Sequence, residues 1–545
     1  MTARAKSEAR AWPQALAAAA ALGALFLVSA RPFLGIPPRN DSRATLWLIE
    51  HASPLAWAFD PRVAAYQFVL FFEPGFALLH FPGLWLAPAL GDPAHHVAAL
   101  AGAACLGLVC ALLVRDATRS LAASCAAAAL VLFSTPVWYG VADSIVCHYP
   151  WATACALASL RAPWRGFWTD GPPPGLARSV ASALAFGAGL CFKESVAAAP
   201  ALIVALHVAA FRRPLAAARF VAPHALVLAA FLAWRTHVLG GAGGYFMLPG
   251  WTPANWLTAL PVLFYAVWGH AAVGLLPIAA LALLRPLALA LALVAWGIGI
   301  APFGLAAPLA PDAFSAARLL FPFAFTGLLL VAAAARHPAY RRRAFRRAAA
   351  AAAAALLALQ LAQRPLVIDT YLRQPADPLP PAPWSEPIVV VSDDWIGPTF
   401  RHQRQPAPKP PLVSYRTALD RALDEALGSA PPPGTRTYGV RERVPTPQLA
   451  PLPEEIATVS FDAWGRAHLA LAERAVGRLW LAVDYANGAT RFLAGHPLLR
   501  EQVDLPLARS VRRLVLFEPR PDGAWPARVW DAPAHLDPWP PAPPR

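Results

Sequence analysis

The sequence predicts an all-α polytopic membrane protein of about 11 transmembrane helices, followed by a small C-terminal α+β domain outside the cytoplasmic membrane. Of the 545 residues, 57% are hydrophobic and only 14% are charged, and the mean hydropathy is +0.46. Soluble domains carry about a quarter charged residues. Long apolar runs recur up to residue 364, whereas 30 of the 59 prolines follow it.

Eleven apolar stretches define the predicted membrane part, residues 1–364. A transmembrane helix needs about 20 predominantly apolar residues. The predicted spans lie near 13–31, 96–114, 120–138, 145–160, 179–192, 195–211, 220–236, 256–282, 286–304, 318–335 and 348–364. The first stretch follows a basic N-terminus and also has the features of a signal peptide, although an uncleaved first helix fits equally well.

The distribution of charge orients these spans. Positively charged residues collect in short cytoplasmic loops. With the N-terminus inside, 18 Lys and Arg lie inside against 8 outside, while 3 acids lie inside against 8 outside. The net charge of +15 lies wholly within residues 1–364, between hydrophobic stretches. The expected partner is therefore the bilayer of the cytoplasmic membrane, and no nucleic-acid binding is expected.

The first outer loop, about 32–95, is long and largely apolar. Its segments suit amphipathic or re-entrant helices at the membrane interface. The alternative is that residues 66–90 form a complete span. Because Glu73 and Pro74 interrupt this stretch, we favour the interfacial interpretation.

A proline-rich linker, residues 365–388, leads to the predicted soluble domain, residues 389–545, which ends in a disordered tail. The runs PIVVVSD and SVRRLVLFEP are typical of strands. SYRTALDRALDEALG and the stretch from about Phe461 to Ala475 have helical spacing. These patterns predict an α+β domain.

Ionisable residues within or beside apolar spans are costly and therefore indicate function. Asp41, in the first outer loop, is a candidate general base, or else an N-cap of a following helix. Lys193 and Glu194 lie where two apolar stretches meet. They form either a phosphate site or a self-neutralising ion pair. Arg318 could hold an anionic headgroup or act as an interfacial anchor.

No cofactor is firmly predicted, and a divalent metal is left open. Several His and Asp side chains fall on the outer side without a strong metal-binding spacing: His95, His96, Asp143 and His148. The sequence contains no Walker A motif, no dinucleotide-binding GxGxxG and no HExxH. An ATP-driven pump or a zinc protease thus has no signature here.

The order of several segments, over roughly residues 13 to 335, resembles the polyprenyl-phosphate-dependent GT-C glycosyltransferases, and within them the protein O-mannosyltransferase-like members. The segments are the first span with its long outer loop, DPAHHVAALAGAACLGLVCALLVRDATRSLAASCAAAALVLFSTPVW, GLCFKESVAAAPALIVAL, WRTHVLGGAGGY and SAARLLFPF. The chain departs from the family pattern at Asn40, which precedes the loop acid, and at Glu73-Pro74, where members commonly carry Arg-Pro.

The resemblance implies that Asp41 is the catalytic base and that Lys193, Glu194, Arg318 and His96 bind the lipid phosphate or the sugar. It implies transfer, with inversion, of a sugar from a polyprenyl-phosphate donor to a glycan, lipid or protein acceptor at the outer face. The alternatives are a transporter or flippase of lipid-linked glycans and an envelope scaffold. A flippase needs ionisable residues at several depths, whereas here the acids of the membrane part collect outside.

Overall fold

The computed structural model divides into two compact units, one of residues 1–36, 73–232 and 251–373, the other of residues 37–72, 233–250 and 374–545. The structure describes residues 3–36, 49, 54–59, 73–143, 146–169, 172–239, 253–269, 271–304, 313–372, 388–391, 413–416, 426–427, 436–438, 447–461, 467–485, 491–493, 498, 501–505, 511–520 and 522–531. Each unit is considered separately.

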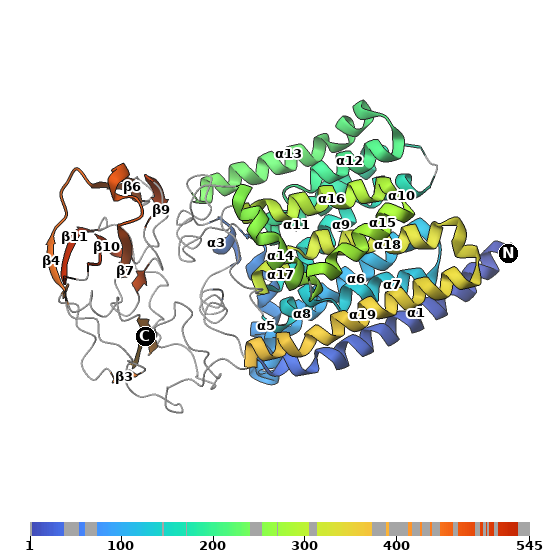
Figure 1. Ribbon diagram of the computed structural model, residues 1–545, viewed down its shortest axis with the longest axis horizontal. Helices are drawn as coiled ribbons and strands as arrows, with labels where there is room; N and C mark the ends of the chain where they lie inside the picture. The colour runs from blue at the N-terminus through green and yellow to red at the C-terminus, as the bar shows by residue number, and fades with distance from the viewer. Residues whose placement is uncertain are drawn as a thin grey trace. The chain divides into compact units, whose positions relative to one another are not determined.

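The first unit is built from helices joined by short turns (Figure 1). Its α-helices are α1 (Ala3–Ala30), α5 (Phe76–Leu90), α6 (Val97–Thr118), α7 (Leu121–Leu132), α8 (Thr135–Ala142), α9 (His148–Ser159), α10 (Arg161–Trp168), α11 (Leu176–Phe192), α12 (Ala199–Phe211), α13 (Pro214–Leu239), α14 (Pro253–Trp268), α15 (Leu275–Leu284), α16 (Pro286–Ile300), α17 (Ala313–Arg318), α18 (Leu320–Arg336) and α19 (Arg343–Leu372). Short 3-10 helices include η1 (Arg31–Gly35), η2 (Asp92–His96) and η4 (Glu194–Val196).

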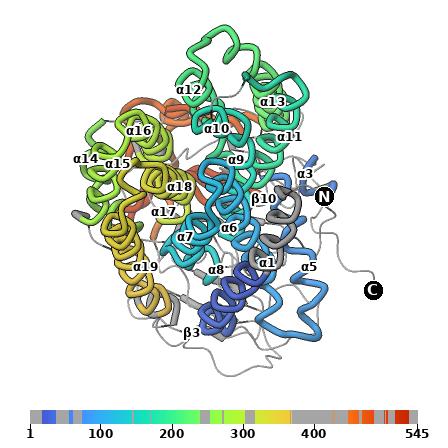
Figure 2. Tube along the Cα trace, turned by 90° about the vertical axis from the view of Figure 1, so that its right-hand side faces the viewer, coloured from blue at the N-terminus to red at the C-terminus, as the bar shows by residue number. Residues whose placement is uncertain are grey.

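Helix α18 lies at the centre of this unit and packs against α6, α7, α9 and α16. Seen along the helices in Figure 2, α6, α9 and α18 occupy the middle, while α1, α13 and α19 lie at the periphery. Small residues allow the close packing: a Cβ on Gly107 of α6 would lie 2.9 Å from Leu132 Cγ of α7. Such glycine contacts are typical of helix packing in membranes.

Within the part of the chain that the structure describes, five helical segments are long and apolar enough to cross a membrane: 17–35, 92–118, 194–211, 214–238 and 343–365. They coincide with five of the eleven predicted spans. A sixth prediction, 120–138, falls on α7 and α8, which are bent by 53° at their junction. The other five fall on α-helices of 10 to 17 residues. The structure therefore supports a helical membrane protein without confirming the count of eleven.

Helix α5 corresponds to the second half of the disputed stretch 66–90. It has 15 residues and contains Pro82 and Pro88. At 1.5 Å per residue it is about 22 Å long, which is less than the roughly 30 Å of a bilayer core. Its buried side includes Phe76 and His80, whereas Trp85 is exposed. This length suits the interfacial interpretation.

The described part of the C-terminal region consists mainly of strands, with the short 3-10 helix η8 (Glu473–Ala475). A parallel sheet has the order β2-β1-β3, a mixed sheet the order β4-β11-β10-β7-β8, and an antiparallel sheet the order β5-β6-β9. The strands are β1 (Ile388–Val391), β2 (Val413–Arg416), β3 (Arg436–Tyr438), β4 (Gln448–Pro451), β5 (Ala457–Phe461), β6 (Ala467–Leu471), β7 (Trp480–Tyr485), β8 (Arg491–Leu493), β9 (Gln502–Leu505), β10 (Val511–Phe517) and β11 (Ala524–Asp531).

The predicted strands PIVVVSD and SVRRLVLFEP are confirmed as β1 and β10. The predicted helix from Phe461 to Ala475 is wrong. Alternate residues of β6 are buried, and β6 pairs with β5 and β9, so tertiary pairing overrides the helical spacing. Of SYRTALDRALDEALG, the first three residues belong to β2, and residues 417–425 lie outside the described part. The predicted linker 365–388 begins within α19, which continues to Leu372.

Glu518, directly after β10, holds two arginines. Arg478 donates from Nε and Nη2 to Glu518 Oε1 at 2.9 and 2.6 Å, and Arg520 donates to Oε2 at 2.8 Å. Burial alone would raise the pKa of Glu518, but the hydrogen bonds and charges of the two arginines outweigh it and lower the pKa below its ordinary value.

This lowered pKa predicts a pH-dependent contribution of Glu518 to stability. The contribution is present above the ordinary glutamate pKa and is lost as the pH falls through the lower pKa of the folded state. We expect Glu518→Gln to destabilise β10 by about 1 kcal/mol or less at neutral pH, because the arginines are half exposed, and to have no effect in strong acid. Hydrogen exchange of β10 peptides, compared between variant and wild type at each pH, measures this; an equal difference at both pH values would contradict it.

Candidate functional site

The segment before α5 lies directly on the end of α11. The Gly75 N–H donates to the Cys191 carbonyl at 2.8 Å. A Cβ on Gly75 would lie 3.0 Å from Phe192 Cδ1 and 3.1 Å from the Cys191 oxygen, so only glycine fits here without displacing its neighbours. Helix α11 then ends because Lys193 has an extended backbone (φ −156°, ψ 125°). These contacts bring Glu73 next to Lys193.

Glu73 and Lys193 form an ion pair inside the helical unit. Lys193 Nζ donates to Glu73 Oε1, and only 6% of the lysine side chain and 10% of the glutamate side chain are exposed. The second carboxylate oxygen, Oε2, lies 3.8 Å from Nδ1 of His148, the first residue of α9. A buried charge pair of this kind is expensive to desolvate, so it calls for a functional explanation.

Tyr149 connects this pair to a second cation. Lys193 Nζ lies 5.2 Å from the centroid of the Tyr149 ring. Arg318, the last residue of α17, donates from Nε to the Tyr149 hydroxyl at 3.3 Å. The guanidinium also lies 6.0 Å from the Phe303 ring centroid. Lys193 and Arg318, more than 100 residues apart in sequence, thus contact the same tyrosine.

We call Glu73, His148, Tyr149, Lys193, Glu194 and Arg318 the charge cluster, in which Glu194 and Arg318 are partly buried. Glu194 begins η4, directly after Lys193, and its charge acts on Glu73, as does that of Arg318. The cluster therefore joins the segment before α5, the start of α9, the end of α11 and the end of α17.

Two predicted site residues are not among these contacts. Asp41 lies outside the described residues. His96 is buried, with Nδ1 2.7 Å from the Val141 carbonyl and Nε2 2.8 Å from the Ile36 carbonyl. Its two ring nitrogens thus connect α8 to the segment that follows η1.

Three members of the cluster were missed as site residues in the sequence: Glu73, His148 and Tyr149. Glu73 carried a usable signal, because an acid within the apolar stretch 66–90 is itself costly. His148 was considered only as a metal ligand. Among the described residues, no group of three or more His, Cys, Asp or Glu side chains could hold a metal ion.

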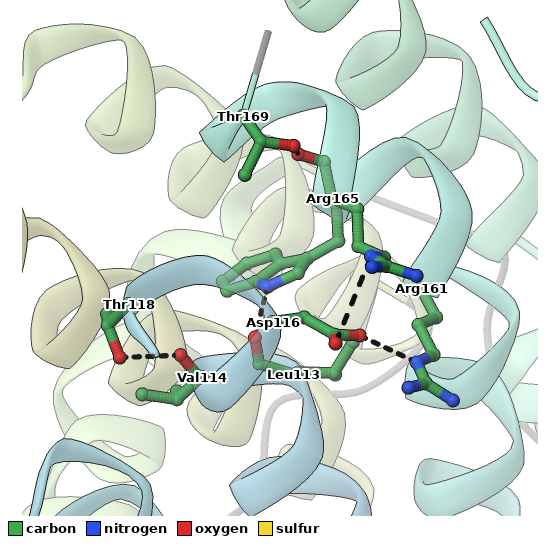
Figure 3. A network of polar contacts seen from close by, with 8 residues as sticks. Leu113, Val114, Asp116, Thr118, Arg161, Arg165 and Thr169 are labelled. Carbon is green, nitrogen blue, oxygen red and sulfur yellow. Dashed lines mark hydrogen bonds and ion pairs between the residues drawn. The ribbon is translucent and has the colours of Figure 1, made fainter. Parts of the chain in front are cut away.

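A different charged network lies at the far ends of α6 and α9. Arg161 Nε donates to Asp116 Oδ2 at 2.7 Å, and Arg165 Nε lies 3.9 Å from Oδ1 (Figure 3). Trp164 Nε1 donates to the Leu113 carbonyl at 2.7 Å. This hydrogen bond connects α10 to α6. Arg161 is about half exposed, and we interpret this network as structural.

Comparison of the chain with protein-family models, curated proteins and solved structures finds no match.

Proposed function

We propose that this chain is an integral membrane glycosyltransferase of the GT-C type. It transfers a sugar from a polyprenyl-phosphate donor to a glycan, lipid or protein acceptor at the outer face of the cytoplasmic membrane. In this proposal the chain crosses the membrane about eleven times, its N-terminus is cytoplasmic, and residues 389–545 are extracytoplasmic.

One observation carries the proposal: Lys193 and Arg318 contact the same tyrosine beside a buried carboxylate. Two cations held close together suit a phosphate group, and arginine and lysine are its usual ligands. The cluster lies at the start of α9, whereas Arg161 follows the end of α9. The positive-inside pattern puts Arg161 on the cytoplasmic side, and the cluster is then on the outer side.

The chemistry needs few groups. Polyprenyl phosphate is a good leaving group, so a base must remove the proton of the acceptor hydroxyl while cations stabilise the charge that develops on the phosphate. We assign the base to Asp41 and the stabilising cations to Lys193 and Arg318, with Glu194 orienting Lys193. A single displacement inverts the anomeric centre.

The distribution of charge favours an enzyme over a transporter. In the described part of the helical unit, the two charged networks analysed above lie at opposite ends of α9. A carrier of lipid-linked glycans requires polar groups along its whole path. The enzyme proposal needs them only at the outer end.

The test uses the full chain reconstituted in liposomes with polyprenyl-phosphate-linked hexoses and pentoses and a membrane extract as the source of acceptor. We expect acceptor-dependent release of polyprenyl phosphate, and a loss of about 100-fold or more in Arg318→Gln, the size of effect of removing one charge-stabilising donor. Arg161→Gln is the matched control and should retain activity. Movement of the donor across the bilayer without release of polyprenyl phosphate would instead identify a transporter.

A further inference from the structure

Lys193, the cation that a donor phosphate would need, already forms an ion pair with Glu73. Lys193 Nζ donates to Glu73 Oε1, and both side chains are buried. A phosphate can reach the ammonium group only if it replaces the carboxylate or shares the lysine with it. Glu73 therefore competes with any anion that binds Lys193.

The described charges of the cluster are balanced in number. Lys193 and Arg318 are cations, whereas Glu73 and Glu194 are acids, and the charges of Glu194 and Arg318 both act on Glu73. Each further negative charge brought to Lys193 is repelled by these acids, and water screens buried charges poorly. An additional negative charge on a bound anion is therefore expected to weaken its binding at Lys193.

The proposed reaction changes the charge of the lipid phosphate. The acceptor oxygen forms a bond to the anomeric carbon while the bond from that carbon to the phosphate oxygen breaks. Its electron pair stays on the phosphate, and the acceptor proton goes to the Asp41 carboxylate. The donor is a phosphodiester with one negative charge, whereas the product is a phosphomonoester with about −1.5 to −2 at neutral pH.

We propose that Glu73 is a specificity-determining counter-ion, which the lipid phosphate displaces from Lys193 and which favours the singly charged donor over the more highly charged product. This inference rests on the proposed function. The second carboxylate oxygen, Oε2, lies 3.8 Å from His148 Nδ1, a distance at which the two form an ion pair when the imidazole is protonated. The displaced carboxylate stays within the cluster, where its charge repels the more highly charged product and promotes its release.

The experiment separates charge from sugar identity. Farnesyl phosphate represents the product, and farnesyl methyl phosphate, a phosphodiester, represents the donor. Binding of both to the full chain in detergent is measured at pH 8, where the monoester carries two charges. We expect Glu73→Gln to shift the ratio of the two dissociation constants about tenfold in favour of the monoester, the scale expected for removing one nearby charge.

Asp116→Asn, which removes an acid from the far end of α6, is the matched control and should leave the ratio unchanged, as should Glu73→Asp, which keeps the charge. If Glu73→Gln does not fold, Glu194→Gln should shift the ratio in the same direction. An unchanged ratio in a folded variant that binds both probes overturns the inference and leaves the proposed function standing. If the wild type binds neither probe, both the inference and the proposed function are overturned.

Discussion

Lys193→Met is expected to lower the free energy of unfolding by about 3–5 kcal/mol, the cost of leaving one member of a buried ion pair without its partner. Glu73 is then buried without the ammonium group that donates to it, so its carboxylate must remain charged there or take up a proton. The side chains of both residues are at least nine-tenths buried, so water cannot replace the lost interaction.

The double variant Lys193→Met with Glu73→Leu should recover most of this loss and unfold within about 1 kcal/mol of the wild type, because apolar replacements of a buried pair are often neutral. Unfolding in mixed detergent and SDS micelles gives the free energies. Arg161→Met is the control: its ion pair with Asp116 is about half exposed on the arginine side, so its loss should cost about 1 kcal/mol or less. A double variant as unstable as Lys193→Met would show that the pair is not coupled.

The helical part of the fold was predictable from the sequence because its signal is local. Apolar length alone located helices such as α6 and α13. Glu73 and Pro74 favoured an interfacial segment over a complete span at residues 66–90; α5 begins after them, at Phe76, and the interfacial position stays a prediction. The prediction of a helix from Phe461 to Ala475 was wrong because strand pairing is not a local signal. The alternating residues AHLAL of this stretch pair with the neighbouring strand β5 and with β9, which lies more than 30 residues further along the chain. Helical spacing alone does not report such pairing.

The site was predictable only in part, for the same physical reason. Lys193 and Arg318 stood out because charge in an apolar segment is costly. The partner of Lys193 is 120 residues away, and no periodicity connects Glu73 to it. Both ring nitrogens of His96 contact backbone carbonyls. Every residue carries such a carbonyl, so the sequence does not reveal which segments His96 connects.

Asp41→Asn is expected to reduce sugar transfer by about 10²- to 10⁴-fold, the contribution of a general base, while the protein folds normally and still binds farnesyl methyl phosphate. The amide has nearly the shape of the carboxylate but cannot accept the hydroxyl proton. Asp60→Asn, at another acid of the same outer loop, is the matched control and should retain activity. Full activity of Asp41→Asn would remove Asp41 from the mechanism. Loss of both activity and probe binding would show that Asp41 maintains the site, as an N-cap would, and does not act as its base.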